Sequence, residues 1–198
     1  MELVIDSATA ACSAALVENG RLLAERHEIV GRGHAERLAP MVEELLAGET
    51  PHALLVDCGP GSFTGVRVGL AFAHGLAIGW GLELNGFSSL ALIAAGAGRP
   101  CAAAIEGGHG EIFVQSFAHD PLRPTDSMRS LSPRSAAEMI ESELLLGSGA
   151  ETLRAARSWG TSEDRLPRAG DALLLPPTLR SLPPRPIYGR APDASLPR

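Results

Sequence analysis

The chain of 198 residues is long enough for one or two compact domains. Hydrophobic residues make up 45% and charged residues 20%, a balance typical of globular proteins. The net charge is −6, and the first 99 residues carry 6 Arg against 11 acids, which disfavours independent tight binding to nucleic acid because phosphates are repelled.

The cysteines and the apolar stretches indicate the compartment. The three cysteines lie far apart, without C-x-x-C spacing, as expected for a reduced protein with buried thiols. The opening "MELVIDSA" contains two acids and does not resemble a signal peptide. The longest charge-free apolar stretch, 68–82, is shorter than the roughly 20 residues of a membrane span. We therefore expect a soluble, cytoplasmic protein.

The first half of the chain alternates strand and helix patterns. An apolar run over 3–6 predicts a buried strand, and a hairpin follows, with Asn19-Gly20 as its two-residue turn. The elements predicted in chain order are strands over 3–6, 12–19 and 20–29, a helix over 34–47, a strand over 52–58, a helix over 64–79, a strand over 82–87, and a helix over 88–97 capped by Ser88 or Ser89. Because Pro40 does not fit an undistorted helix interior, the first helix either begins near Pro40 or kinks there.

The stretch "GAGRP" at 96–100 is the best candidate for a domain boundary, dividing residues 1–98 from 99–198. The elements predicted after it are a hairpin of 101–106 and 111–117, a helix over 132–142 with Ser132 as its cap, a strand over 143–149, a helix over 150–159, and an extended C-terminal segment. Each half begins with a hairpin and then alternates helix and strand. The order predicts two α/β lobes of related build.

Residues 59–65, "GPGSFTG", form a segment that we call the glycine loop. A strand end, a glycine turn and a helix start are typical of an anion site. The spacing nevertheless fails the Walker A loop, the dinucleotide fingerprint and the nucleophile elbow. Two interpretations stay open, a phosphate-binding loop and a tight turn whose helix is capped by Ser62 or Thr64. The possible anion- or nucleotide-binding residues are Asp6, Gly59, Gly61, Ser62 and Thr64.

Asp6 ends the first strand beside a hydroxyl-rich turn. It could help to hold a phosphate group through a bound cation, or it could be a solvated acid that caps the turn. An alternative function is therefore an actin-like ATPase or phosphotransferase that uses Asp6 and the glycine loop. A peptidase with Ser62 as nucleophile is a weaker alternative, since no base is identifiable. No pair of histidines has H-x-x-x-H spacing, so no metal site is predicted.

Small residues recur every four positions along the helix that follows the loop. Such a stripe lets another backbone approach closely, either the protein's own sheet or a neighbouring helix. We expect packing at or just beneath a partner interface. The candidate residues on the two first-lobe helices are Leu38, Met41, Val42, Leu45, Gly65, Gly69, Ala73 and Leu76.

One segment is specific to a known family. "GPGSFTGVRVGLAFAHGLA", residues 59–77, closely resembles the signature of the TsaB (YeaZ) family. Four further stretches also resemble that family: "LVIDSATAACSAAL", "GHAERLAPMVEELL", "AAIEGGHGEIFVQSF" and "PPRPIYGRAPDA". Together they cover most of the chain. The family's Asp-Ala-Arg in the second hairpin is replaced here by Glu106-Gly107-Gly108.

The resemblance implies an α/β, two-lobed actin-like ATPase (ASKHA, RNase H-like) fold. It implies a non-catalytic subunit that dimerises with the TsaD transferase subunit, which threonylcarbamoylates the tRNA adenosine next to the anticodon. It further implies the TsaE ATPase as a third subunit, a homodimer when the chain is alone, contact with tRNA only through the complex, and no membrane. No cofactor of its own is expected, because other subunits of the complex bind the ATP and the metal.

Overall fold

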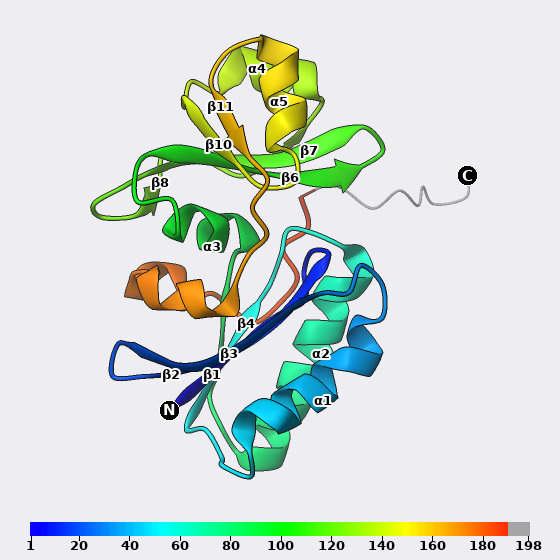
Figure 1. The fold of residues 1–198 in the computed structure, drawn as a ribbon, viewed down its shortest axis with the longest axis vertical. Coiled ribbons are helices and arrows are strands. Elements are labelled where there is room, and N and C mark those ends of the chain that lie inside the picture. Colours follow the sequence, from blue (N-terminus) through cyan, green and yellow to red (C-terminus); the bar gives the residue numbers. More distant parts are fainter. Residues whose placement is uncertain (190–198) are drawn as a thin grey trace, which may run out of the picture.

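The computed structural model describes residues 1–189 and contains two β-sheets with helices around and between them (Figure 1). The first sheet has five strands in the order β3-β2-β1-β4-β5. Its strands are β1 (Glu2–Asp6), β2 (Ala11–Glu18), β3 (Arg21–Ile29), β4 (Ala53–Asp57) and β5 (Leu84–Phe87). The first three pair antiparallel as the predicted hairpin requires, and Asn19 and Gly20 both have positive φ in its turn. β4 and β5 run parallel to β1.

Two helices cover the outer face of this sheet, α1 (His34–Leu46) and α2 (Phe63–Trp80). They lie side by side (Figure 1). Alternate strand residues such as Leu3, Ile5 and Leu54 pack against them in one buried cluster. The alternation of side chains along each strand therefore gives the sheet two apolar faces, as expected for a sheet covered on both sides.

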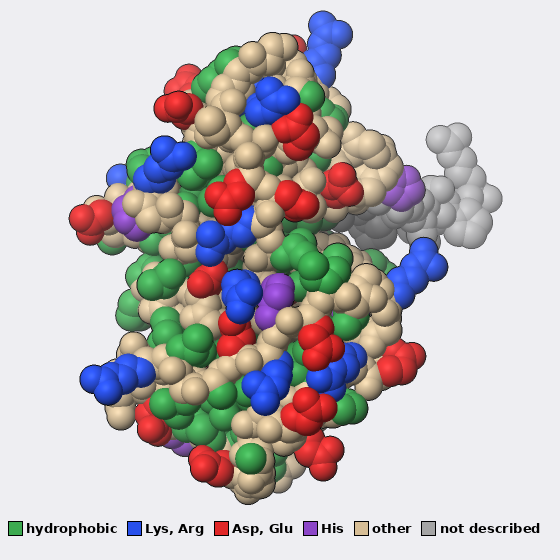
Figure 2. All heavy atoms as spheres, in the orientation of Figure 1, with side chains coloured by type: hydrophobic (Ala, Val, Ile, Leu, Met, Phe, Trp, Pro, Cys, Tyr) green, Lys and Arg blue, Asp and Glu red, His purple; other side chains and the backbone are tan. Residues whose placement is uncertain are grey.

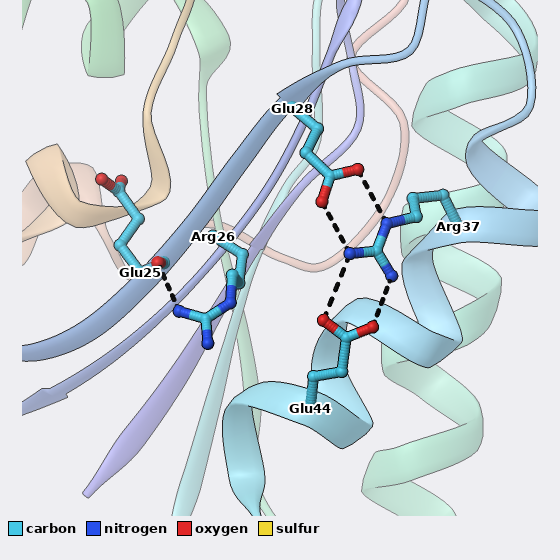
Figure 3. Close-up of polar contacts among 5 residues, drawn as sticks. All are labelled: Glu25, Arg26, Glu28, Arg37 and Glu44. Carbon is cyan, nitrogen blue, oxygen red and sulfur yellow. Dashed lines mark hydrogen bonds and ion pairs between the residues drawn. The ribbon is translucent and has the colours of Figure 1, made fainter.

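Helix α1 is continuous across Pro40, so the prediction that the helix could begin there was wrong. The exposed ring lies on the solvent side, where the lost backbone hydrogen bond is least costly. Figure 3 shows how α1 is tied to the sheet: the guanidinium of Arg37 contacts Glu28 on β3 at 2.6 and 2.7 Å and Glu44 on α1 at 3.0 and 3.3 Å. Both contacts are bidentate, the geometry that a guanidinium fork favours.

A second sheet of six strands lies on the other side of a central helical layer (Figure 1). Its order is β11-β10-β6-β7-β8, with β9 paired to β7. The strands are β6 (Cys101–Gly108), β7 (Glu111–Ala118), β8 (Arg123–Pro124), β9 (Arg129–Leu131), β10 (Leu144–Leu146) and β11 (Thr161–Glu163). α4 (Pro133–Met139) and α5 (Ala150–Arg157) cover its far face. Ser132 caps α4 as predicted, because its hydroxyl accepts a hydrogen bond from the amide of Ser135.

The central layer contains α3 (Ser89–Ala95), every residue of which is buried, and the 3₁₀ helix η1 (Ala169–Leu174). Ser88 occupies the N-cap of α3, but its side chain makes no capping hydrogen bond. The core between the sheets contains residues of both, including Val4 and Leu55 from the first and Ile105 from the second. A buried apolar layer therefore joins the two halves of the described chain.

The C-terminal part of the described chain returns to the first sheet. The amide of Ala169 donates to the Ser13 hydroxyl at 2.9 Å. After η2 (Pro177–Leu179), Leu182 pairs antiparallel with Gly86 of β5. The strands of the two sheets fall on either side of the predicted division at residues 98 and 99, which itself stays a prediction. The end of the predicted "PPRPIYGRAPDA" segment, from 190, lies outside the described residues. No helix within residues 1–189 is long and apolar enough to cross a membrane.

Candidate functional site

The candidate site lies where β1 and β4 end side by side. Residues 3–5 of β1 are in parallel register with residues 54–56 of β4, so the next residues, Asp6 and Asp57, stand next to each other at the strand ends. Both are almost completely buried. The two turns that follow are the β1–β2 turn (residues 7–10) and the glycine loop (residues 59–65), and they pack on each other.

Hydrogen bonds and close backbone contacts hold the glycine loop against the β1–β2 turn. The amide of Ser62 donates to the carbonyl of Ala8 at 2.6 Å. The hydroxyl of Ser7 donates to the carbonyl of Gly65 at 2.9 Å. A Cβ atom at Gly61 would lie 2.1 Å from the Ala8 carbonyl oxygen, and one at Gly65 would lie 2.1 Å from that of Ser7. These glycines are therefore required by the close approach of two backbones.

Three of the amides that a phosphate loop would offer, those of Gly59, Ser62 and Gly65, donate within the protein. The amide of Gly59 donates to Asp57 Oδ1 at 2.6 Å, and that of Gly65 donates to Ser62 Oγ at 3.2 Å. Ser62 is the N-cap of α2, and Thr64 lies exposed in its first turn. The geometry therefore favours the tight-turn interpretation, and it gives Ser62 a capping role in place of the nucleophile role.

Asp6 and Asp57 both accept hydrogen bonds that the sequence interpretation did not include. Asp6 Oδ1 accepts a hydrogen bond from the amide of Ala8 at 2.9 Å. Asp6 therefore caps its turn, as one of the two interpretations of the sequence expected, but its side chain is buried and not solvated. Asp57 Oδ1 also accepts from the Ser89 hydroxyl at 2.8 Å. Burial first, and then the facing charge of Asp57, raise the pKa of Asp6 well above its ordinary value.

Sequence reasoning missed Asp57 as a member of this site. The signal was present, because "LVID" and "LLVD" are two apolar runs that both end in aspartate. Their adjacency depends on strand order, which periodicity does not give. Burial is also the main cause that raises the pKa of Asp57, opposed by the donors Gly59 and Ser89.

A shallow cleft of about 400 Å³ opens between the sheets near the end of β3. It is lined by His27, Ile29, Asp164, Arg165, Leu166 and Arg168. Its arginines are already paired, Arg165 with Asp171 at 2.8 Å and Arg168 with Glu25. Their charge is therefore largely neutralised within the protein, which disfavours binding of a polyanion there. Within residues 1–189, no group of three or more His, Cys, Asp or Glu side chains is placed to hold a metal ion.

The predicted interface residues face inward. Leu38, Met41, Val42, Leu45, Gly65, Gly69 and Ala73 are buried in the protein's own core, and Leu76 is partly buried. A Cβ atom at Gly69 would lie 2.5 Å from Ser7 Oγ. The stripe thus packs on the first sheet and its turn, so these residues lie beneath the outer surface of α1 and α2. The interface itself stays a prediction.

The outer face of α2 has a different composition. Ile78 is 82% exposed, and Phe63 is also exposed. Around Gly75 and Gly79, nothing lies within 4 Å of the position of a Cβ atom. The tertiary fold thus leaves a small-residue surface uncovered around the large apolar side chain of Ile78, on the helix that the sequence singled out.

Two α/β lobes, the first with strand order β3-β2-β1-β4-β5 and helices on both faces, define the actin-like ATPase fold. Two solved structures cover nearly the whole chain. YeaZ from Pseudomonas aeruginosa matches with a TM-score of 0.79 and 28% identity, over 94% of this chain and 98% of that one. A protein of the same organism, described as similar to peptidase YEAZ, matches with a TM-score of 0.80 and 28% identity, over 96% and 99%.

Sequence relatives agree with the structural match. The tRNA threonylcarbamoyladenosine biosynthesis protein TsaB of Escherichia coli (strain K12) is 40% identical over 60% of this chain and 55% of its own length. TsaB of Haemophilus influenzae is 35% identical over 61% and 55%. The matches thus span about half the length of these curated relatives. A family model described as TsaD, tRNA N6-adenosine threonylcarbamoyltransferase, matches residues 26–123. The sequence and structural matches together support assignment of the chain to the TsaB (YeaZ) family.

Proposed function

We propose that this protein is a non-catalytic subunit of tRNA threonylcarbamoyladenosine biosynthesis, which dimerises with the TsaD transferase acting on the adenosine next to the anticodon. Membership of the TsaB family supports the pathway. The observation that carries the partner role is the uncovered outer face of α2, with Ile78 exposed between Gly75 and Gly79.

The shape of this face suits a helix–helix contact. Two glycines without neighbours allow a partner helix to approach the backbone of α2 closely, and Ile78 supplies an apolar side chain that contact would remove from water. Helix α1 lies beside α2 and extends the platform (Figure 1). The eight candidate residues named above, which are buried or partly buried on the inner sides of α1 and α2, would hold the two helices in position.

The TsaD family model that matches residues 26–123 supports the choice of partner. The matched range includes α1 and α2, so the two proteins share the unit that carries the proposed interface. Two related units can pair through equivalent faces in a near-twofold arrangement, as identical subunits do. The same geometry would also produce a homodimer when the chain is alone.

The glycine loop and the acids support a non-catalytic role. The loop amides of Gly59, Ser62 and Gly65 donate within the protein, and the inward-facing acids Asp6 and Asp57 lie together. We propose that the chain has no cofactor of its own, and that ATP and metal are bound by other subunits, with TsaE as the ATPase. On the face seen in Figure 2, basic and acidic side chains are interspersed, which fits contact with tRNA only through the complex.

Complex formation tests this proposal. The full chain would be mixed with purified TsaD at micromolar concentration and separated by size-exclusion chromatography with light scattering. We expect a species of the summed mass, since a stable interface buries at least about 1,000 Å². Separate elution of the two chains at these concentrations would contradict the proposal.

A further inference from the structure

The facing carboxyl groups of Asp6 and Asp57 have an unbalanced set of hydrogen bonds. One oxygen of each is satisfied, that of Asp6 by the amide of Ala8 and that of Asp57 by Gly59 and Ser89. The other oxygen of each, Oδ2, is buried and has no donor among the described residues. Two buried acceptors without donors at adjacent strand ends lower the stability of the fold, because desolvation of each oxygen is not offset by a hydrogen bond.

Asp6 and Asp57 follow paired residues of two neighbouring parallel strands, so the two side chains stand next to each other with both free oxygens buried. As two carboxylates they would repel in a buried place, whereas one added proton turns one of the free oxygens into a donor for the other. A single proton therefore removes the repulsion and satisfies both orphaned oxygens.

We propose that Asp6 and Asp57 share one proton, and that this shared proton fastens the β1–β2 turn to the glycine loop. Asp57 accepts two other hydrogen bonds, so it is the better carboxylate, and the proton resides on Asp6. The pair lies at the sheet edge at which the sequence suggested a phosphate site. The two carboxyl groups together carry one negative charge instead of two.

Among residues 1–189, no positively charged side chain is a main influence on the pair, so none takes the place of the proton. The other titratable neighbours are the thiols of Cys12 on β2 and Cys58 in the loop, whose pKa values are raised chiefly by burial and then by the nearby acids. α3 contributes the neutral Ser89. The main interactions on the two acids within residues 1–189 include no Arg or His side chain.

The shared proton gives the fold a pH dependence of definite sign. The folded state raises the pKa of the pair above the ordinary value of an aspartate, so it holds a proton that the unfolded chain releases. The stabilisation is fully present below the ordinary pKa of an aspartate, and it is lost progressively as the pH rises from there through the raised pKa of the pair. Repulsion between the two carboxylates would then loosen the β1–β2 turn from the glycine loop.

Urea unfolding of the full chain between pH 5 and 9 tests the proposal with Asp6→Asn. An amide at position 6 can donate the same hydrogen bond without titrating. Relative to the variant, wild-type protein should lose up to about tenfold in its folding equilibrium constant per pH unit over the range in which the folded state keeps the proton that the unfolded chain has released. The control Asp164→Asn changes an exposed acid and should keep the wild-type pH dependence. Identical pH profiles for wild type and Asp6→Asn would overturn the proposal.

A spectroscopic readout does not depend on the stability of the variant. The infrared spectrum of folded wild-type protein near neutral pH should contain the carbonyl stretch of a protonated carboxylic acid, absent from Asp6→Asn and present in Asp164→Asn. A spectrum with carboxylate bands alone would overturn the proposal. Stabilisation of wild type but not Asp6→Asn by added Na⁺, K⁺ or Mg²⁺ would also overturn it, because it would assign the space to a cation.

Discussion

The hydroxyl of Ser7 donates a hydrogen bond of 2.9 Å to the carbonyl oxygen of Gly65, and so joins the β1–β2 turn to the first turn of α2. The approach is so close that a Cβ atom at position 65 would lie 2.1 Å from the carbonyl oxygen of Ser7 itself. The small residues of α2 therefore form two groups, an inner stripe that includes Gly65 and Gly69, which the fold requires, and the outward-facing Gly75 and Gly79, which it leaves free.

Alanine substitution should separate these two groups. Gly65→Ala must displace backbone and should destabilise the protein by about 1–3 kcal/mol or more. Gly75→Ala enters open space on a helix and should stabilise it by up to about 1 kcal/mol, because alanine is the better helix former. Urea denaturation of both variants gives the comparison. Equal effects of the two substitutions would show that the small residues are not divided in this way.

Ser62 should matter as a helix cap and not as a nucleophile. Its Oγ accepts from the amide of Gly65, so Ser62→Ala should lower the free energy of unfolding by about 1 kcal/mol. Thr64→Ala, which changes an exposed residue in the first turn of the same helix, should change it much less. Covalent labelling of wild-type Ser62 by a fluorophosphonate probe would contradict the assignment.

Arg37 should contribute a salt-sensitive link between α1 and the sheet. It bridges Glu28 on β3 and Glu44 on α1 through bidentate contacts that are partly open to solvent (Figure 3). Arg37→Gln should lower the melting temperature modestly in dilute buffer, and the difference should shrink at high salt as screening increases. Arg134→Gln, at a fully solvated position, is the control and should have little effect at either salt concentration.

The chain alone should not respond to nucleotide. Because the loop amides of Gly59, Ser62 and Gly65 donate within the protein, adding ATP with magnesium should leave the melting temperature of the isolated protein unchanged. A dose-dependent rise, together with ATP turnover by the chain alone, would favour the ATPase alternative built on Asp6 and the loop.

Much of the fold follows from local sequence signals. Asn19-Gly20 specifies the hairpin, Ser132 caps α4, and the apolar spacing of 34–47 and 64–79 gives the two outer helices. These features need only neighbours in the sequence. The short strands β8, β9 and β11 were not predicted, since two or three residues carry too little periodicity.

The parts that sequence did not predict depend on long-range pairing. Asp57 joins Asp6 only because β4 lies beside β1, and the return of Leu182 to Gly86 spans almost half the chain. The direction of the small-residue stripe was also undetermined, because packing on a sheet and packing on a partner helix both favour glycine and alanine at this spacing. Burial decides it, with Gly69 inside and Gly75 outside.

The central claim is that the outer face of α2 binds TsaD. Calorimetric titration of TsaD with two matched variants tests it, Ile78→Asp on that face and Ile29→Asp at the end of β3, where isoleucine is 73% exposed. Both changes put a charge on the surface, so neither should prevent folding. The account predicts that Ile78→Asp weakens binding by about tenfold or more, as for an apolar anchor in an interface, while Ile29→Asp binds like wild type. Equal affinity of wild type and Ile78→Asp for TsaD would contradict it.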